Sequence, residues 1–283
     1  SLTPVMNWFF DHQFENADYW NQSVLLEIKD DVEIPLLERT FGEIIQHHDA
    51  LRLNYDPHKE QLYYQNRYLE GNFELPIYDL TEMNPSEQLE ELKKESQKLK
   101  AGFNIEDSLL IKAAIFELGQ AGRRLLITAH HLVVDGFSWR IILEDLASGY
   151  LQFKETNSLS YGAKTTSVME WAEELGEYSK SKESEEEIPY WESTLEAIQP
   201  IPTDYEGEDF GTIGKSESCQ ASFEEDETQF LLKKANETYN TRIDELLLVG
   251  LAKTISEWLD REQIFLQLEG HGREEIVPDL DLS

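Results

Sequence analysis

The chain has 283 residues, enough for two lobes or domains of ordinary size. Its 24 Lys and Arg residues stand against 57 Asp and Glu residues, which gives a formal net charge of −33 at pH 7. Such a charge repels nucleic acid duplexes and anionic membrane surfaces, so neither is expected as a partner. Cys219 is the single cysteine, which excludes an internal disulfide and suits a reducing compartment.

No apolar run approaches the roughly 20 residues that a membrane-spanning helix needs. The first residues, Ser1-Leu2-Thr3-Pro4, lack the basic and then apolar build of a signal peptide. We therefore expect a cytoplasmic protein.

Helical periodicity appears first in residues 36–51, where apolar side chains recur every three to four positions. This stripe consists of Leu37, Phe41, Ile44, Ile45, His48 and Leu51. Residues 85–101 are predicted to form a second helix. Asn84 and Glu87 match a capping box at its start, and Gly102 is suited to its C-terminal cap.

Short apolar or alternating segments between and after these helices predict strands. They are residues 62–66, 73–78, 109–118 and 125–131. A Gly-Gln-Ala-Gly turn at residues 119–122 joins the last two into a pair. Because strands and helices interleave along the chain, the fold class is predicted to be α/β or α+β.

The segment from His130 to Trp139 leads from the last of these strands into an amphipathic stretch at 141–150, which predicts strand, tight loop and helix. Histidine is the side chain best suited to moving a proton near neutral pH, so we expect the chemistry here. Strand alternation places His131 on one face, with Leu125, Ile127 and Ala129, and His130 on the other. Only one histidine can then face a substrate, and the other is expected to be buried and hydrogen-bonded.

The second half begins with a helical pattern over residues 166–196, interrupted by a charged run at 179–187. A lobe boundary is expected within 180–214, because residues 200–214 are rich in Gly and Pro. A second α/β unit is predicted beyond it. Its elements are a strand near 216–223, helices near 226–239 and 244–259, and a strand at 264–269.

The last predicted strand ends in the sequence Glu-Gly-His-Gly-Arg-Glu at residues 269–274. Alternation puts Glu269 on the more polar face of the strand, where a cleft or solvent would lie. A catalytic carboxylate and a solvated strand end are equally open interpretations. Gly270 and Gly272 flank His271 and would let the backbone turn sharply or approach a ligand closely.

Other interpretations of these residues compete with catalysis. Asp135 is suited to cap the following helix or to pair with a buried Arg, and a structural role is favoured for it. Gly136 is expected to supply an unusual backbone angle. A metal site is disfavoured, because adjacent histidines on opposite strand faces cannot chelate one ion and the H-E-x-x-H spacing is absent. The G-x-S-x-G elbow of many hydrolases is also absent.

The HHxxxDG element at residues 130–136 is shared by the condensation superfamily of nonribosomal peptide synthetases and by chloramphenicol-acetyltransferase-like acyltransferases. Alone it leaves the choice between them open. The longer run from His130 to Arg140 resembles the version in epimerization domains, and residues 269–275 match the EGHGRE motif that distinguishes these from condensation domains. Further resemblances, in family order, are at residues 2–10, 48–52 and 244–248.

This resemblance implies a two-lobed, chloramphenicol-acetyltransferase-like fold of α/β (α+β) class. Residues 1–180 would form a complete N-terminal lobe, 181–214 the connection between lobes, and 215–283 the first part of the C-terminal lobe. The family continues beyond EGHGRE with an RTVGWFT-like segment and further strands. A chain of this extent is therefore expected to have an unpaired sheet edge and an open active-site tunnel.

The resemblance also implies the reaction. Epimerization domains remove and return the Cα proton of an aminoacyl or peptidyl thioester, which a carrier protein presents on its 4'-phosphopantetheine arm. His131 and Glu269 would be the catalytic pair, with no metal and no cofactor bound by the domain itself. The supporting residues would be His130, Asp135, Gly136, Ser138, Trp139, Gly270, His271, Gly272 and Arg273.

The implied partners are the carrier protein and the adenylation and condensation domains of the same assembly line. Two alternatives remain at this point. One is a condensation domain that joins two carrier-bound substrates by a peptide bond. The other is a catalytically inactive fragment that binds a carrier protein.

Overall fold

The computed structural model describes residues 2–29, 31–202, 215–278 and 280–282. The chain divides into two compact units: residues 1–186 together with 270–283, and residues 187–269. The predicted connection at 181–214 lies partly outside the described residues. None of the helices in the described ranges combines the length and the apolar character that crossing a membrane demands.

The first unit is built on two β-sheets. The larger has the strand order β1-β6-β5-β4, in which β4 pairs parallel to β5 and the other pairs are antiparallel. Its strands are β1 (Asn21–Ile28), β4 (Ile77–Asp79), β5 (Ile111–Glu117) and β6 (Arg123–His130). The smaller sheet is the antiparallel pair β2 (Leu53–Asp56) and β3 (Gln61–Tyr64). The sequence patterns predicted β3, β5 and β6, whereas the strand predicted at 73–78 overlaps β4 only at residues 77–78, and β1 and β2 were missed.

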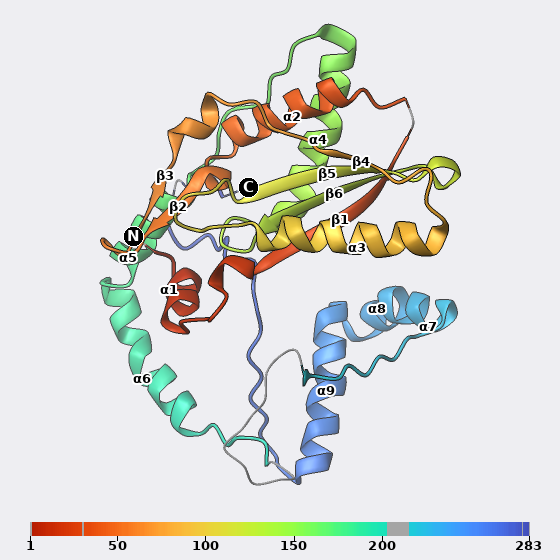
Figure 1. Cartoon of the computed structure of the whole chain (residues 1–283). Coiled ribbons are helices and arrows are strands. Elements are labelled where there is room, and N and C mark those ends of the chain that lie inside the picture. Colours follow the sequence, from red (N-terminus) through yellow and green to blue (C-terminus); the bar gives the residue numbers. More distant parts are fainter. Residues whose placement is uncertain (1, 30, 203–214, 279, 283) are drawn as a thin grey trace. The chain divides into compact units, whose positions relative to one another are not determined.

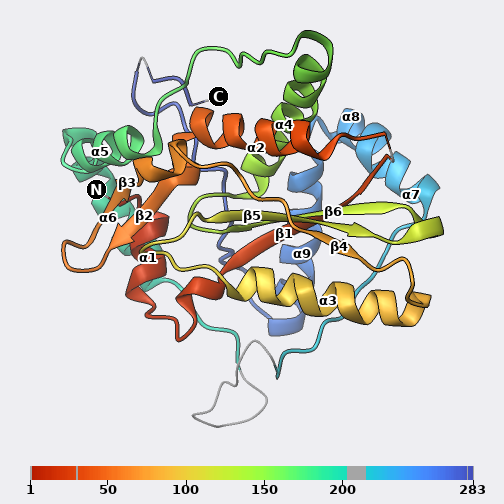
Figure 2. The ribbon, with the colours of Figure 1, turned by 45° about the horizontal axis from the view of Figure 1, so that its top comes forward.

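Helices cover both faces of the larger sheet. Figure 1 and Figure 2 show α2 and α4 against one face and α3 against the other. The helices of this unit are α1 (Pro4–Asp11), α2 (Ile34–His47), α3 (Pro85–Ala101), α4 (Gly136–Thr156) and α5 (Val168–Tyr178), and α6 (Lys182–Glu196) follows. The predicted capping box of α3 is confirmed, with Asn84 and Glu87 each bonding the other's backbone N–H and Gly102 at the C-cap.

Alternation along β6 places its side chains in two separate cores. Leu125, Ile127 and Ala129 belong to the main apolar cluster beneath α2 and α4. Leu126 belongs to a smaller cluster with Phe116, against which Leu92 and Leu99 of α3 pack. Every one of these β6 side chains is at least 95% buried, so a one-residue slip of the strand would exchange two packed faces. The register of β6, and hence the direction of each histidine at its end, is strongly specified.

The charged run after α5 is largely helical, contrary to the prediction of an interruption over 179–187. The break is confined to residues 179–181, and α6 starts at Lys182. Glu and Lys are good helix formers, and Lys182 and Glu186 form an i,i+4 ion pair at 2.9 Å, so charge alone does not end a helix.

The second unit contains helices but no strand in its described part. The segment from α7 (Glu225–Gln229) to α8 (Asn236–Tyr239) is continuous through a π-helical stretch at Phe230–Ala235, and α9 (Ile243–Leu259) follows. The strands predicted at 216–223 and 264–269 are therefore wrong. Alternation fits a strand to a half-buried surface, but a strand forms only against a hydrogen-bonded neighbour. Here Phe223 and Leu268 remain 62% and 64% exposed.

Candidate active site

The HHxxxDG segment forms the connection between β6 and α4. His130 is the last residue of β6 and is fully buried. Its Nε2–H donates to the Ala17 carbonyl at 2.7 Å, and its Nδ1 accepts from the Leu132 backbone N–H at 3.0 Å. The prediction that one histidine of the pair is buried and hydrogen-bonded is confirmed for His130.

Burial also gives His130 a pH dependence. Desolvation lowers the pKa of His130, against weaker opposing effects of the Ala17 carbonyl and Asp18. Below about pH 6.5 the His130 side chain is therefore protonated in the unfolded chain but stays neutral in the folded chain. Above that pH, His130 does not reduce the unfolding free energy. Below it, we expect the unfolding free energy to fall by up to about 1.4 kcal/mol per pH unit.

Urea unfolding between pH 8 and pH 5 measures this effect. The slope of unfolding free energy against pH is expected to be smaller in His130→Gln, which has no titrating ring at this position. His58→Gln, at an exposed site, is the matched control and should retain the wild-type slope. Parallel curves for the wild type and His130→Gln would contradict the assignment.

His131 begins the loop, and its imidazole is only partly buried. Its backbone N–H donates to the Trp20 carbonyl at 2.7 Å, which extends the pairing of β6 with the β1 side of the sheet by one residue. The ring makes two hydrogen bonds. Nδ1 lies 2.8 Å from the Val134 carbonyl, and Nε2 lies 2.8 Å from the side-chain nitrogen of Gln22.

Gln22 was missed by the sequence patterns. It lies on β1, directly opposite Ala129 of β6, and this register brings it beside His131. Trp139 of α4 reaches the same side chain, since its indole N–H donates to Gln22 Oε1 at 2.8 Å. The indole is 8% exposed, so the contact is nearly sealed from solvent. The Gln22 side-chain amide of β1 thus contacts both α4 and the loop that follows β6.

Asp135 has the capping role considered for it, and it also pairs with an arginine, although this arginine is only partly buried. It is the N-cap of α4, and its Oδ1 accepts from the backbone N–H and the hydroxyl of Ser138, both at 2.6 Å. Its Oδ2 pairs with Arg273 at 3.1 Å. Burial would raise the pKa of Asp135, but the hydrogen bonds from Ser138 and Arg273 outweigh it and lower the pKa. Arg273 also lies 3.4 Å from the Ser138 hydroxyl.

These two roles can be separated by mutation. Asp135→Ala removes the cap and the charge, and we expect unfolding free energy to fall by about 1–2 kcal/mol. Asp135→Asn keeps a capping oxygen and loses only the partly exposed ion pair, so about 0.5 kcal/mol is expected. Urea denaturation measures both, with Asn84→Ala as the control for a cap without an ion pair. Equal losses for Asn and Ala would mean that the ion pair dominates.

Gly136 does not have the role predicted for it. It has no left-handed backbone angle and is simply the first residue of α4, exposed and with no atom near the position of a Cβ. The chain changes direction at Asp135, whose extended backbone with φ −131° and ψ −177° needs no glycine.

The EGHGRE segment is anchored to the first unit through Arg273. Gly272 has a φ of +68°, a left-handed conformation that favours glycine, whereas Gly270 has no positive φ. His271 is exposed, and its Nδ1 accepts from the Arg273 backbone N–H at 3.0 Å. The Arg273 guanidinium stacks over the Phe137 ring at 4.7 Å. Glu269 is the last residue of the second unit, and its side chain is exposed.

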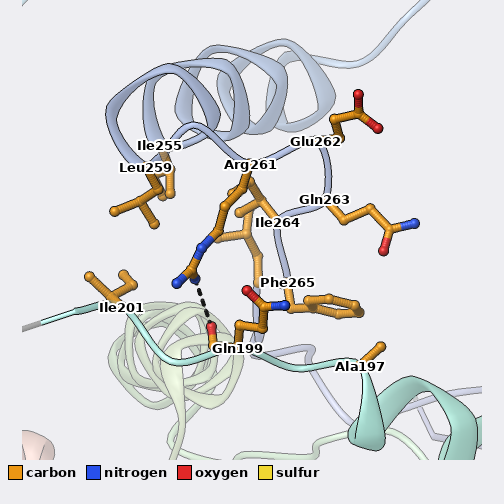
Figure 3. Close-up of a pocket in the computed structure, with 11 residues that line it drawn as sticks. Ala197, Gln199, Ile201, Ile255, Leu259, Arg261, Glu262, Gln263, Ile264 and Phe265 are labelled. Atoms are coloured by element: carbon orange, nitrogen blue, oxygen red, sulfur yellow. Dashed lines mark hydrogen bonds between the residues drawn. The ribbon is translucent and has the colours of Figure 1, made fainter.

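Neither of two pockets formed by described residues is lined by a predicted site residue. One, of about 360 Å³, lies within the second unit between the end of α9 and residues 197–201. Figure 3 shows Arg261 beside it, donating to the Gln199 carbonyl at 3.1 Å. The other, of about 420 Å³, lies in the first unit and is lined by polar side chains that include His47, Arg52 and Lys164.

Known proteins align with the chain over its whole length. The model of the Condensation domain family matches residues 1–283. One of the mycosubtilin synthase proteins of Bacillus subtilis is 40% identical over 286 residues, covering 100% of this chain and 11% of that protein. Gramicidin S synthase 1 of Brevibacillus brevis is 36% identical over 287 residues, covering 100% of this chain and 26% of that protein. The chain therefore spans only a small part of these relatives.

Solved structures of condensation and epimerization domains are similar to this chain. The crystal structure of the epimerization domain from the third module of tyrocidine synthetase B has a TM-score of 0.89 at 32% identity, covering 99% of this chain and 64% of that one. The first condensation domain of the calcium-dependent antibiotic synthetase has a TM-score of 0.67 at 17% identity, covering 90% and 59%, and shares the fold. The predicted chloramphenicol-acetyltransferase-like α+β fold is confirmed.

Proposed function

The chain belongs to the condensation-domain family of nonribosomal peptide synthetases, and from this premise we propose that it is an epimerization domain. It would invert the Cα centre of an aminoacyl or peptidyl group, from L to D, by removing and returning a proton. The group would be held as a thioester on the 4'-phosphopantetheine arm of a carrier protein. The domain would be an isomerase that binds no cofactor of its own.

One observation carries this proposal beyond the family. Residues 269–274 spell EGHGRE, and Arg273 of this sequence bonds to Asp135 of the HHxxxDG segment at 3.1 Å. This contact joins residue 273 of the EGHGRE segment to the HHxxxDG segment within the first unit. Glu269 precedes Arg273 by four residues in the chain, and Asp135 follows His131 by four. The likeness to a solved epimerization domain, at a TM-score of 0.89, adds support.

The reaction needs an acid and a base on the two faces of Cα and a donor for the developing enolate oxygen. We assign the acid and base roles to His131 and Glu269. The thioester carbonyl withdraws electron density from Cα, so the C–H electron pair passes into an enolate as the proton leaves. A proton returned to the opposite face gives the other stereoisomer, with no net oxidation or reduction.

The partners follow from the proposed reaction. The substrate is delivered by a carrier protein, which an adenylation domain loads, and the product passes to a condensation domain. The multidomain size of the relatives supports this context.

A carrier assay tests the proposal. The full chain is incubated in D₂O with a carrier loaded with the L-aminoacyl group of its own adenylation domain, and the released amino acid is analysed by chiral chromatography and mass spectrometry. D-isomer carrying one deuterium at Cα is expected. A new amide after addition of a loaded acceptor carrier would instead indicate condensation, and an unchanged thioester would indicate a binding module.

Glu269→Gln tests the carboxylate. We expect the rate of Cα exchange to fall by about 10²–10⁴-fold, the usual contribution of a general acid or base. Glu262→Gln, an exposed carboxylate of the same unit, is the matched control and should exchange at the wild-type rate. Full exchange in Glu269→Gln would remove Glu269 from the catalytic pair.

A further inference from the structure

Donor and acceptor chemistry fixes the orientation of the Gln22 amide. The indole N–H of Trp139 can only donate, and it lies 2.8 Å from Oε1 of Gln22. A flipped amide would set two N–H donors against each other. The atom that lies 2.8 Å from His131 Nε2 is therefore the amide nitrogen, which donates to the ring.

The other side of the imidazole leads to the same result. The Val134 carbonyl can only accept, and it lies 2.8 Å from Nδ1 of His131, so Nδ1 carries a proton. Nε2 accepts from Gln22 and therefore carries none. Two independent partners thus define one state of the ring, the neutral imidazole with its lone pair at Nε2.

We propose that Gln22, clamped by Trp139, is a positioning residue that holds His131 as the neutral tautomer with no proton on Nε2, so that this nitrogen can receive a proton once the amide N–H gives way to the substrate. This inference rests on the proposed epimerization and adds a division of roles to it. Gln22 comes from β1, Trp139 from α4 and His131 from the loop between β6 and α4, so the tautomer depends on the packing of all three.

The proton step follows from this arrangement. The Cα–H bond breaks, its electron pair enters the enolate, and the proton joins the Nε2 lone pair to give an imidazolium. Nδ1–H continues to donate to Val134. Gln22 must leave Nε2, because a protonated Nε2 and the amide N–H would be two facing donors. Trp139 holds Oε1, so the amide does not turn to accept from the imidazolium, which favours release of the proton.

Tautomer measurement tests the proposal without reference to activity. The full chain is labelled with ¹⁵N-histidine, and the ring signals of His131 are assigned with His131→Asn. A neutral ring protonated at Nδ1 is expected. Gln22→Glu replaces the donor with a carboxylate acceptor and is expected to add a proton at Nε2, which gives an imidazolium whose Nδ1–H still donates to Val134. Ser23→Ala, the next residue of β1, is the matched control and should leave the ring signals unchanged.

Two variants link the tautomer to the reaction. Gln22→Leu and Trp139→Phe remove the donor and its clamp, and we expect both to lower kcat for Cα exchange by about 10- to 100-fold, by analogy with the loss of the partner that orients a metal-bound histidine. KM for the loaded carrier is expected to stay at the wild-type value, because neither group binds the carrier in this account. A rise in KM with unchanged kcat would overturn it.

The two proposals fail in different ways. A wild-type ring protonated at Nε2, or a ring in Gln22→Glu that stays unprotonated at Nε2, would overturn the role of Gln22 even where epimerization is observed. A ring protonated at Nδ1 that responds to Gln22→Glu would support the positioning role even where no D-isomer is formed, and the proposed function alone would then fail.

Discussion

His131→Ala is expected to slow Cα exchange by about 10²–10⁴-fold while leaving the protein folded. The side chain is only partly buried and makes two hydrogen bonds, so we expect the unfolding free energy to change by about 1 kcal/mol. Deuterium incorporation at Cα measures the first quantity and urea denaturation the second. Added imidazole is expected to restore part of the exchange.

The matched control for this variant is His58→Ala. His58 is exposed in the turn between β2 and β3, far along the chain from the HHxxxDG segment. Its loss should leave both exchange and stability unchanged. Exchange at the wild-type rate in His131→Ala would remove the imidazole from the catalytic pair.

His130→Ala is expected to have the opposite effect, a loss of stability of about 3–5 kcal/mol. The substitution opens a cavity in a fully buried position beside Phe9, whose ring centroid lies 5.9 Å from that of the imidazole. It also leaves the buried Leu132 N–H without its partner, which costs about 1–3 kcal/mol, whereas the Ala17 carbonyl still accepts from the Trp20 N–H at 3.2 Å. Urea denaturation measures the change.

Exchange in His130→Ala should persist where the variant remains folded, because His130 takes no part in the proton transfer. The two adjacent histidines therefore have separate roles: His130 contributes to stability and His131 to the reaction. A stable His130→Ala variant without exchange would contradict this division.

Local sequence rules predicted much of the first unit. The alternation in residues 125–131 placed His130 and His131 on opposite faces, because successive side chains of a strand must alternate. The capping box at Asn84 marked the start of α3, because its partners lie three residues apart. In both cases the determining contacts are close in sequence.

The wrongly predicted strand at 264–269 and the missed residue Gln22 both depend on contacts between distant residues. Residues 264–269 alternate as a strand does, but alternation carries no information on whether a neighbour is present to pair with it. Gln22 resembles any other polar residue at the start of a strand. Only the register of β1 against β6 reveals that it meets His131, 109 positions later in the chain.

The contact between Arg273 and Asp135 bears on folding, because it closes a long loop of the chain. Residues 270–283 return to the first unit after the excursion of residues 187–269, and Thr166 and Asp281 exchange backbone and side-chain hydrogen bonds there. Closing a flexible loop of about 80 residues has an entropic cost of about 4 kcal/mol. Local folding of the excursion removes part of that cost in advance. The contact of Arg273 with Asp135 is therefore expected to form more favourably once the described helices of the inserted segment have formed.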